Sequence, residues 1–265
     1  MDFRQQKRIK GMVKLILLYG MTFFLALATA PAPADPPDPQ QIVDAAIEAH
    51  GGEGFQWAQI EFDFRDKHYT AIRRGGLFSY ERRFSAPEGE IRDMLSNDGF
   101  TRNINGKAVE LSEEWKSRYG NSVNSVIYFA LLPYGLNDPA VQKRYLGEVT
   151  IKGEPYHKIE ITFRPEDGGK DYEDEFIYWF HQEKHTLDYL AYRFHTDGGG
   201  TRFREAYRRH QAGGLLLTDF YNYVGPKNDT PLSDFDRLYQ QGDLEIISDI
   251  DLNNLQVHPL TAGTR

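Results

Sequence analysis

The chain has 265 residues, of which 31 are Lys or Arg and 39 are Asp or Glu, and it contains no cysteine. The lack of cysteine excludes disulfide bonds, thiolate metal sites and a cysteine nucleophile. A formal net charge of -8 disfavours nucleic-acid binding, because neutralising phosphates needs a concentrated cationic surface. An aromatic content of 14% argues against intrinsic disorder. The composition therefore predicts a soluble, acidic, globular protein.

The first 34 residues have the layout of a secretory signal peptide. Basic residues precede an uncharged apolar stretch from Leu15 to about Ala30. We expect cleavage after Ala34 rather than after Ala30, where Pro31 would lie just beyond the cut, and this leaves residues 35–265 as a single domain. A retained membrane anchor is the alternative, because the uncharged run reaches the roughly 20 residues that span a bilayer. Since no cysteine can be lipid-modified, we expect the processed protein to be free in the periplasm.

The first half of the mature chain predicts one helix followed by a meander of strands. Asp38 is a good N-cap, Pro39 suits the first helical position, and Gly51 ends the helix. From Gln59 onward the apolar residues alternate with polar ones, which indicates half-buried strands. The predicted strands are 59–65, 68–73, 77–83, 91–96 and 100–104, and Asn105-Gly106 favours a tight hairpin after the last of them.

A second helix is predicted from Ser112 to about Leu132, with Ser112 as its cap and Pro133 closing it. Its later half, residues 126–132, is apolar on nearly all sides. This half must therefore be covered on more than one side or face a hydrophobic cavity.

The rest of the chain predicts hairpins and one short helix. The helix is capped by Ser233 and ends near Gly242, and we expect the tail after Leu255 to be loose. Strands are not separated by regular helices, which disfavours a parallel α/β sheet or barrel. The predicted strands are 145–151, 156–163, 175–181, 186–195, 201–210, 215–224 and 244–252.

Three segments carry a resemblance to a known family: Ile42 to Gly52 with a strand near Ile60, the hairpin containing 178–180 and 186–190, and Gly213 to Leu217. In their order and spacing they resemble secreted bacterial proteins related to the outer-membrane lipoprotein carrier superfamily, which includes the LolA and LppX types. The resemblance implies an α+β fold, a curved antiparallel β half-barrel with helices packed on its concave face, and a site for acyl chains there. A filled β core without a cavity is the alternative.

Aromatic side chains are the best candidates for lining such a cavity. Each methylene group withdrawn from water contributes about 0.8 kcal/mol, so the lining matters more than any single polar residue. At each position an ordinary core role is the alternative. The predicted lining residues are Phe62, Phe64, Tyr80, Tyr128, Phe129, Trp179 and Tyr189.

Three arginines are candidates for contacting a ligand head group. Arg202, Arg204 and Arg208 alternate along one predicted strand and would share one face of it. A guanidinium group binds phosphate or carboxylate well. The alternative is an outward strand face that is paired with acidic neighbours.

No motif predicts catalytic residues, a metal site or a cofactor. His181 and His185 are four residues apart, which suits zinc only on a helix, and their flanks read as strands. We therefore expect a periplasmic binding or carrier protein for a lipid-like ligand, with no covalent chemistry, no nucleic-acid partner and no stable membrane span after processing. An envelope protein is a further candidate partner.

Two alternatives predict different features. A hydrolase or lyase with a histidine–carboxylate site predicts titratable groups that converge in one cleft. A structural interaction module of the envelope predicts a filled sheet and an exposed apolar patch.

Overall fold

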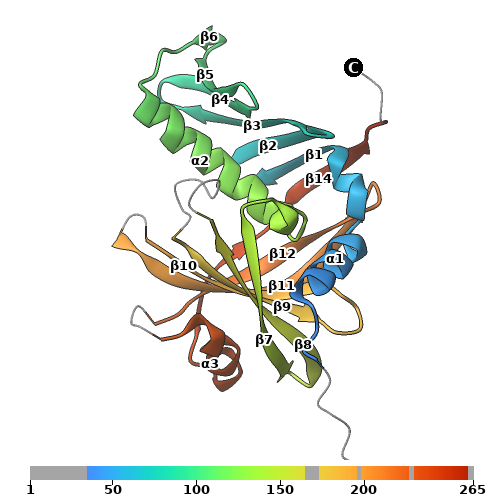
Figure 1. Cartoon of the computed structure of the whole chain (residues 1–265). Coiled ribbons are helices and arrows are strands. Elements are labelled where there is room, and N and C mark those ends of the chain that lie inside the picture. The colour runs from blue at the N-terminus through green and yellow to red at the C-terminus, as the bar shows by residue number, and fades with distance from the viewer. Residues whose placement is uncertain (1–34, 165–172, 196–197, 227–229, 262–265) are drawn as a thin grey trace, which may run out of the picture. The chain divides into compact units, whose positions relative to one another are not determined.

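Two open antiparallel sheets of seven strands each organise the protein in a computed structural model that describes residues 35–164, 173–195, 198–226 and 230–261 (Figure 1). The predicted signal peptide and the cut after Ala34 lie outside the described residues. The first sheet has the order β14-β1-β2-β3-β4-β5-β6. Its strands are β1 (Trp57–Phe64), β2 (Lys67–Arg74), β3 (Leu77–Ala86), β4 (Gly89–Ser96), β5 (Gly99–Ile104), β6 (Lys107–Ala108) and β14 (Asn253–Pro259).

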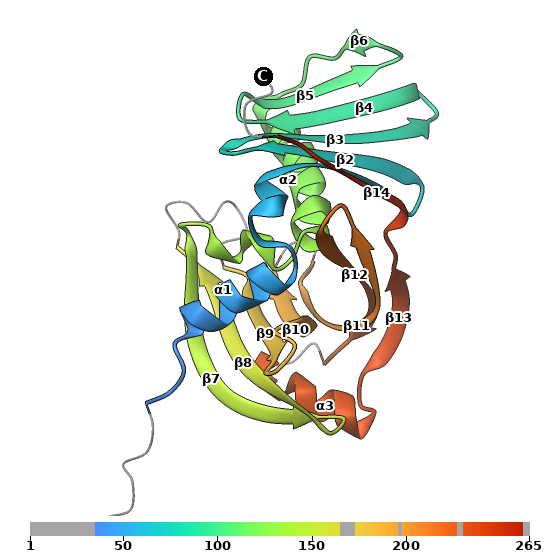
Figure 2. The ribbon, with the colours of Figure 1, turned by 90° about the vertical axis from the view of Figure 1, so that its right-hand side faces the viewer.

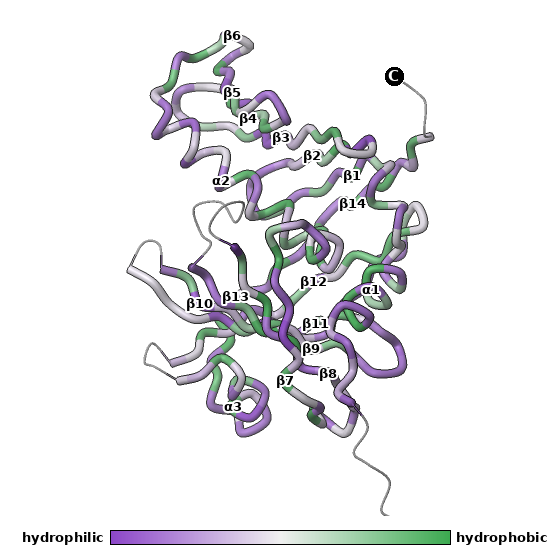
Figure 3. Tube along the Cα trace, viewed as in Figure 1, coloured by the Kyte–Doolittle hydropathy of each residue, from purple (hydrophilic) through white to green (hydrophobic). Residues whose placement is uncertain are grey.

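The second sheet has the order β13-β12-β11-β10-β9-β8-β7. Only two residues separate β13 from β14, so the last strands of the chain connect the two sheets (Figure 2). The strands are β7 (Val141–Ile151), β8 (Glu154–Phe163), β9 (Glu175–His181), β10 (Leu187–Phe194), β11 (Gly200–Ala212), β12 (Leu215–Val224) and β13 (Glu245–Ile250). Apolar residues are interspersed with polar ones along the strands of both sheets, as Figure 3 shows.

Two helices share one face of this structure, which we call the inner face. Val43 and Ala46 of α1 (Pro39–Ala49) pack against the second sheet. In α2 (Glu113–Ala130), Val123 and Ile127 belong to the core of the first sheet, while Phe129 packs against the second sheet. The predicted class, an α+β antiparallel half-barrel with helices on its concave face, is confirmed by this arrangement.

The third helix, α3 (Phe235–Gln241), packs on the opposite face of the second sheet. Side chains point alternately to the two faces of β9, so that Tyr178 lies under α1 and α2 while Trp179 lies under α3. The second sheet is therefore buried on both faces, which explains why its strands carry aromatic residues on both sides.

Local sequence signals place the starts of α1 and α2 where they were expected. The Asp38 carboxylate accepts a hydrogen bond from the Gln40 amide at 2.9 Å and caps α1. The Ser112 hydroxyl accepts one from the Trp115 amide at 3.4 Å and caps α2. The cap of α3 is Asp234 rather than the predicted Ser233, and Gly242 ends that helix at a φ of 79°.

The C-terminal segment differs from its prediction. The expected single strand 244–252 ends at Ile250 as β13, and the expected loose tail forms β14, which pairs with β1 from Ala58–Pro259 to Asp63–Asn253. Only Leu255 and Val257 of β14 pack against the core. A short edge strand with so few apolar residues carries little local signal, because its stability comes from a partner about 190 positions earlier in the chain.

A buried ion cluster fixes α2 to the first sheet. Asp93 on β4 is fully buried and accepts hydrogen bonds from Arg82 at 2.6 and 3.0 Å and from Arg102 at 2.6 and 2.9 Å. Arg82 also donates to the Ser122 hydroxyl of α2 at 2.8 Å, and the Arg102 guanidinium lies 3.6 Å from the Tyr119 ring centre. The cluster therefore joins three strands and the helix through one carboxylate.

Candidate ligand cavity

A cavity of about 480 Å³ lies on the inner face, between the second half of α2 and strands β10 to β13. Its walls are mainly apolar, and its polar groups come mostly from β11 and β12. The apolar lining is Phe64, Val126, Phe129, Ala130, Tyr192, Phe220, Ile247, Ile250 and Leu252. The polar lining is Arg65, Ser125, Arg202, Arg204, Thr218, Asn222 and Ser248.

Regular backbone geometry explains how these side chains come together. Val126 and Phe129 are three residues apart on α2 and so share one face of the helix. Thr218, Phe220 and Asn222 alternate along β12, which places all three on the inner face of the sheet. The cavity is therefore bounded by one helix face and one sheet face.

Arg204 is the charged residue buried deepest in this lining, at 8% exposure. Its guanidinium donates to the Tyr192 hydroxyl at 3.1 Å and lies 4.1 Å from the centre of the Phe129 ring. No described carboxylate forms an ion pair with it, and its buried Nε–H has no acceptor among the described residues. Aromatic faces and one hydroxyl thus provide the surroundings of this charge.

Two further polar atoms in the lining are buried without partners in the described part of the chain. They are the Thr218 hydroxyl and the Asn222 side-chain oxygen. The Asn222 amide nitrogen does have a partner, because it donates to the Ser248 hydroxyl at 3.2 Å. The cavity therefore keeps hydrogen-bonding capacity that the surrounding protein leaves unused.

Four of the predicted site residues line this cavity: Phe64, Phe129, Arg202 and Arg204. Arg202 donates to the carbonyl oxygen of Thr201 at 2.8 Å. The structure thus brings one residue from β1, one from α2 and two from β11 to the same space.

Three other predicted lining residues lie in the surrounding core. Phe62 stacks on Tyr69 at 5.5 Å between ring centres, and Tyr80 contacts Arg73 in the first sheet. Tyr128 packs between α2 and the second sheet. These side chains support the walls and are not among the lining residues.

Trp179 and Tyr189 lie on the face opposite the cavity. Both pack on Phe203, each with its ring centre 5.7 Å from that of Phe203, and both belong to the cluster under α3. The alternation along β9 and β10 sends them away from the inner face.

Arg208 is also separated from the other two arginines. A bulge between Ala206 and Arg208 shifts the register, so that Ala206 pairs with Phe220 while Arg208 pairs with Asp219. Paired residues share a face, and this shift turns Arg208 away from the face of Arg204. The Arg208 Nε instead donates to buried Asp219 at 2.6 Å.

Several lining residues were not predicted, above all Tyr192, Thr218, Phe220 and Asn222. The alternation within β12 could have placed 218, 220 and 222 on one face. It could not have shown which face of the strand meets α2.

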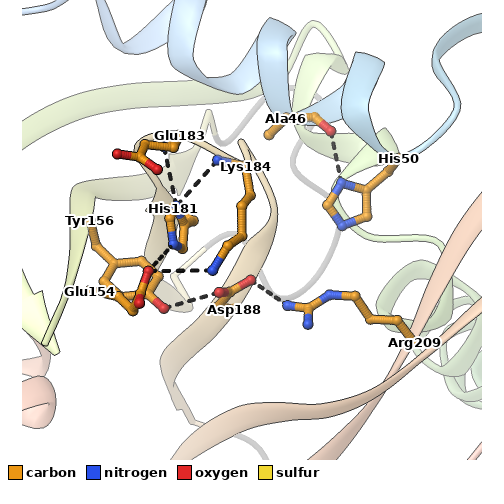
Figure 4. A network of polar contacts seen from close by, with 9 residues as sticks. All are labelled: Ala46, His50, Glu154, Tyr156, His181, Glu183, Lys184, Asp188 and Arg209. Carbon is orange, nitrogen blue, oxygen red and sulfur yellow. Dashed lines mark hydrogen bonds and ion pairs between the residues drawn. The ribbon is translucent and has the colours of Figure 1, made fainter. Parts of the chain in front are cut away.

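A separate polar network lies near the ends of β8, β9 and β10 (Figure 4). His181 accepts hydrogen bonds at Nδ1 from the amides of Glu183 and Lys184 at 3.1 and 3.2 Å. Its Nε2 therefore carries the proton and donates to Glu154 at 2.7 Å. Lys184 contacts the same Glu154 oxygen at 3.3 Å. Glu154 therefore connects the turn after β9 to the start of β8.

The neighbouring groups in Figure 4 form a second set of contacts. Asp188 accepts a hydrogen bond from Tyr156 at 3.0 Å and pairs with Arg209. His50 donates from Nδ1 to the Ala46 carbonyl at 2.8 Å, and burial lowers the pKa of His50. None of these residues lines the 480 Å³ cavity.

Neither network is arranged for metal binding. Within residues 35–164, 173–195, 198–226 and 230–261, no group of three or more His, Asp or Glu side chains could hold a metal ion. In the same ranges, no helix is both long and apolar enough to cross a membrane.

The sequence matches one family over most of its length. Residues 21–252 match the profile described as "Family of unknown function (DUF6503)". The chain therefore belongs to this family. No curated protein matches the sequence.

Solved structures show likeness of fold at low sequence identity. A LolA superfamily protein of Nitrosomonas europaea is 12% identical with a TM-score of 0.44, and the match covers 76% of this chain and 98% of that one. A DUF1329 family protein of Desulfovibrio piger is 13% identical with a TM-score of 0.38, over 77% and 98%. The lipoprotein LppX of Mycobacterium tuberculosis is 11% identical with a TM-score of 0.28, over 60% and 91%. These similar structures include proteins of the LolA and LppX types that the sequence resembles, and the similarity assigns no ligand.

Proposed function

We propose that this protein binds and carries a lipid-like molecule in the inner cavity, without covalent chemistry. The observation that carries this proposal is the cavity of about 480 Å³, walled mainly by apolar side chains of α2 and β10 to β13. Its volume falls within the range of about 300–1,000 Å³ that is usual for small-molecule sites. An acyl chain placed there gains about 0.8 kcal/mol for each methylene group removed from water.

A bulky side chain at the cavity wall tests this proposal. Ser125 is exposed on α2 and lines the cavity, whereas the preceding residue, Asn124, is exposed and does not line it. We expect Ser125→Trp to weaken binding of the neutral fluorescent probe N-phenyl-1-naphthylamine at least tenfold, because the indole occupies the space of the probe. Fluorescence titration of purified protein measures the affinity.

Asn124→Trp is the matched control, and we expect its affinity to stay within twofold of the wild type. The indole at position 125 can turn to solvent instead of entering the cavity. Val126→Trp places an indole deeper on the same wall and therefore tests the cavity independently. Wild-type affinity in both cavity variants, or a wild-type protein that takes up no probe, would contradict the proposal.

We further propose that the carrier is residues 35–265, released into the periplasm after removal of a signal peptide. The support is the basic start and the apolar stretch that follows it. The intact mass of the protein recovered from cells should correspond to a chain that begins at Asp35. A recovered mass that includes the residues before Leu15 would show a retained anchor instead.

A further inference from the structure

The cavity combines apolar walls with buried polar groups that lack partners. Arg204 Nε, the Thr218 hydroxyl and the Asn222 side-chain oxygen are each without a hydrogen bond in the described part of the chain. Each of these residues is at least 92% buried. Arg204 and Asn222 are directly opposite each other on β11 and β12, so these two unused groups are neighbours, and Thr218 lines the same cavity four residues along β12 from Asn222. Buried polar atoms are nearly always hydrogen-bonded, which makes this grouping informative.

The charge of the cavity lining also favours a polar ligand group, and specifically an anionic one. Arg65, Arg202 and Arg204 all belong to the lining, whereas no Asp or Glu is among the described residues that form it. This cationic lining stands out in a protein with a formal net charge of -8. A buried charge without a counterion is costly, and a bound anion removes that cost.

Other buried arginines of the same protein have a carboxylate partner that Arg204 lacks in the described part of the chain. Arg82 and Arg102 each make two hydrogen bonds to the carboxylate of Asp93. Arg204 is buried to a similar degree, and among the described residues its partners are one tyrosine hydroxyl and two aromatic faces. The first sheet therefore supplies a carboxylate to its buried arginines, whereas the described part of the second sheet supplies none to Arg204.

We propose that the ligand is an anionic amphiphile whose carboxylate or phosphate head group binds Arg204, while a single apolar chain lies against Phe129, Phe220 and Ile250. This inference rests on the proposed function and names the chemical class of the ligand. Arg202 is two residues from Arg204 on β11, lines the same cavity and is the second cation available to the head group, and Thr218 adds a hydroxyl to the lining. The volume fits one chain better than several.

Three ligands of equal chain length test this assignment: dodecanoate, dodecyl phosphate and dodecanol. Displacement of N-phenyl-1-naphthylamine at pH 8 measures each affinity. We expect the wild type to bind at least one of the anions about tenfold or more tightly than dodecanol, because hydrogen bonds to a charged group are strong. The two anions distinguish a carboxylate from a phosphate head group.

Arg204→Met should remove this preference and leave dodecanol affinity within about twofold, since methionine keeps an apolar wall. Retained dodecanol binding also shows that the variant is folded. Arg204→Lys keeps the charge without the planar guanidinium, and we expect it to keep part of the preference. Arg144→Gln is the matched control, because Arg144 is an exposed residue on β7 that pairs with Glu160 outside the cavity.

Three other results would contradict different parts of the proposal. Equal affinity of the wild type for all three ligands, or an unchanged preference in Arg204→Met, would overturn the anionic assignment while leaving the lipid-binding function intact. Displacement of the probe by inorganic phosphate as effectively as by dodecyl phosphate would show a site for a free anion and overturn the amphiphile. Failure of the probe and of all three ligands to bind would overturn the proposed function itself.

Discussion

Replacing Asp93 by asparagine is expected to lower the free energy of unfolding by about 3–5 kcal/mol. Asp93 is fully buried, and its two oxygens are the acceptors for both Arg82 and Arg102. Asparagine has nearly the same shape but no charge, and so it leaves two buried guanidinium groups without a counterion. Urea unfolding followed by circular dichroism measures the change.

The control for this prediction is an ion pair with the same chemistry at the surface. Glu160→Gln removes the partner of Arg144, whose side chain is 67% exposed, and we expect a much smaller loss because solvent screens that pair. Replacing Arg82, Asp93 and Arg102 together by apolar residues should recover much of the stability that Asp93→Asn loses. Equal losses in Asp93→Asn and Glu160→Gln would show that the buried cluster has no special role.

Truncating Trp179 to alanine is expected to cost about 3–5 kcal/mol of unfolding free energy. The side chain is fully buried under α3 and packs on Phe203. Removing it leaves a large cavity between the sheet and a helix of only seven residues, which cannot close the space by itself. Thermal and urea unfolding measure the loss, and Trp115→Ala, at a site that is 45% exposed, should change stability little.

The same position separates a core role from a ligand role. Trp179→Phe keeps an aromatic ring in the core, and we expect it to bind N-phenyl-1-naphthylamine as the wild type does, because Trp179 lies on the face opposite the cavity. A clear loss of probe affinity in this folded variant would mean that the ligand reaches the space under α3.

The sequence predicted the elements well because their signals are local. Alternation from Gln59 onward, the Asn105-Gly106 turn and the caps Asp38 and Ser112 each depend on neighbouring residues only. The turn residues Asn105 and Gly106 have φ values of 51° and 78°, as a tight hairpin requires. Local chemistry therefore specified most strands and the helices, and β14, which lacks such local signals, is the exception.

The site was predicted only in part, because its composition depends on which face of each strand meets α2. Aromatic residues occupy both faces of β9, so its sequence could not show that Trp179 is on the outer face and Tyr178 on the inner one. Strict alternation predicts that Arg202, Arg204 and Arg208 share one strand face, and the bulge after Ala206 breaks this alternation. Both differences arise from tertiary packing rather than from local propensity.

The pairing of β14 with β1 has a consequence for how the fold is completed. β1 receives its outer neighbour from residues 253–259, roughly 190 positions later in the sequence. Until those residues have been synthesised, β1 presents an open row of backbone donors and acceptors, the kind of surface through which unfinished chains associate. A chain without residues 253–259 would therefore keep an unpaired strand edge that is prone to aggregation.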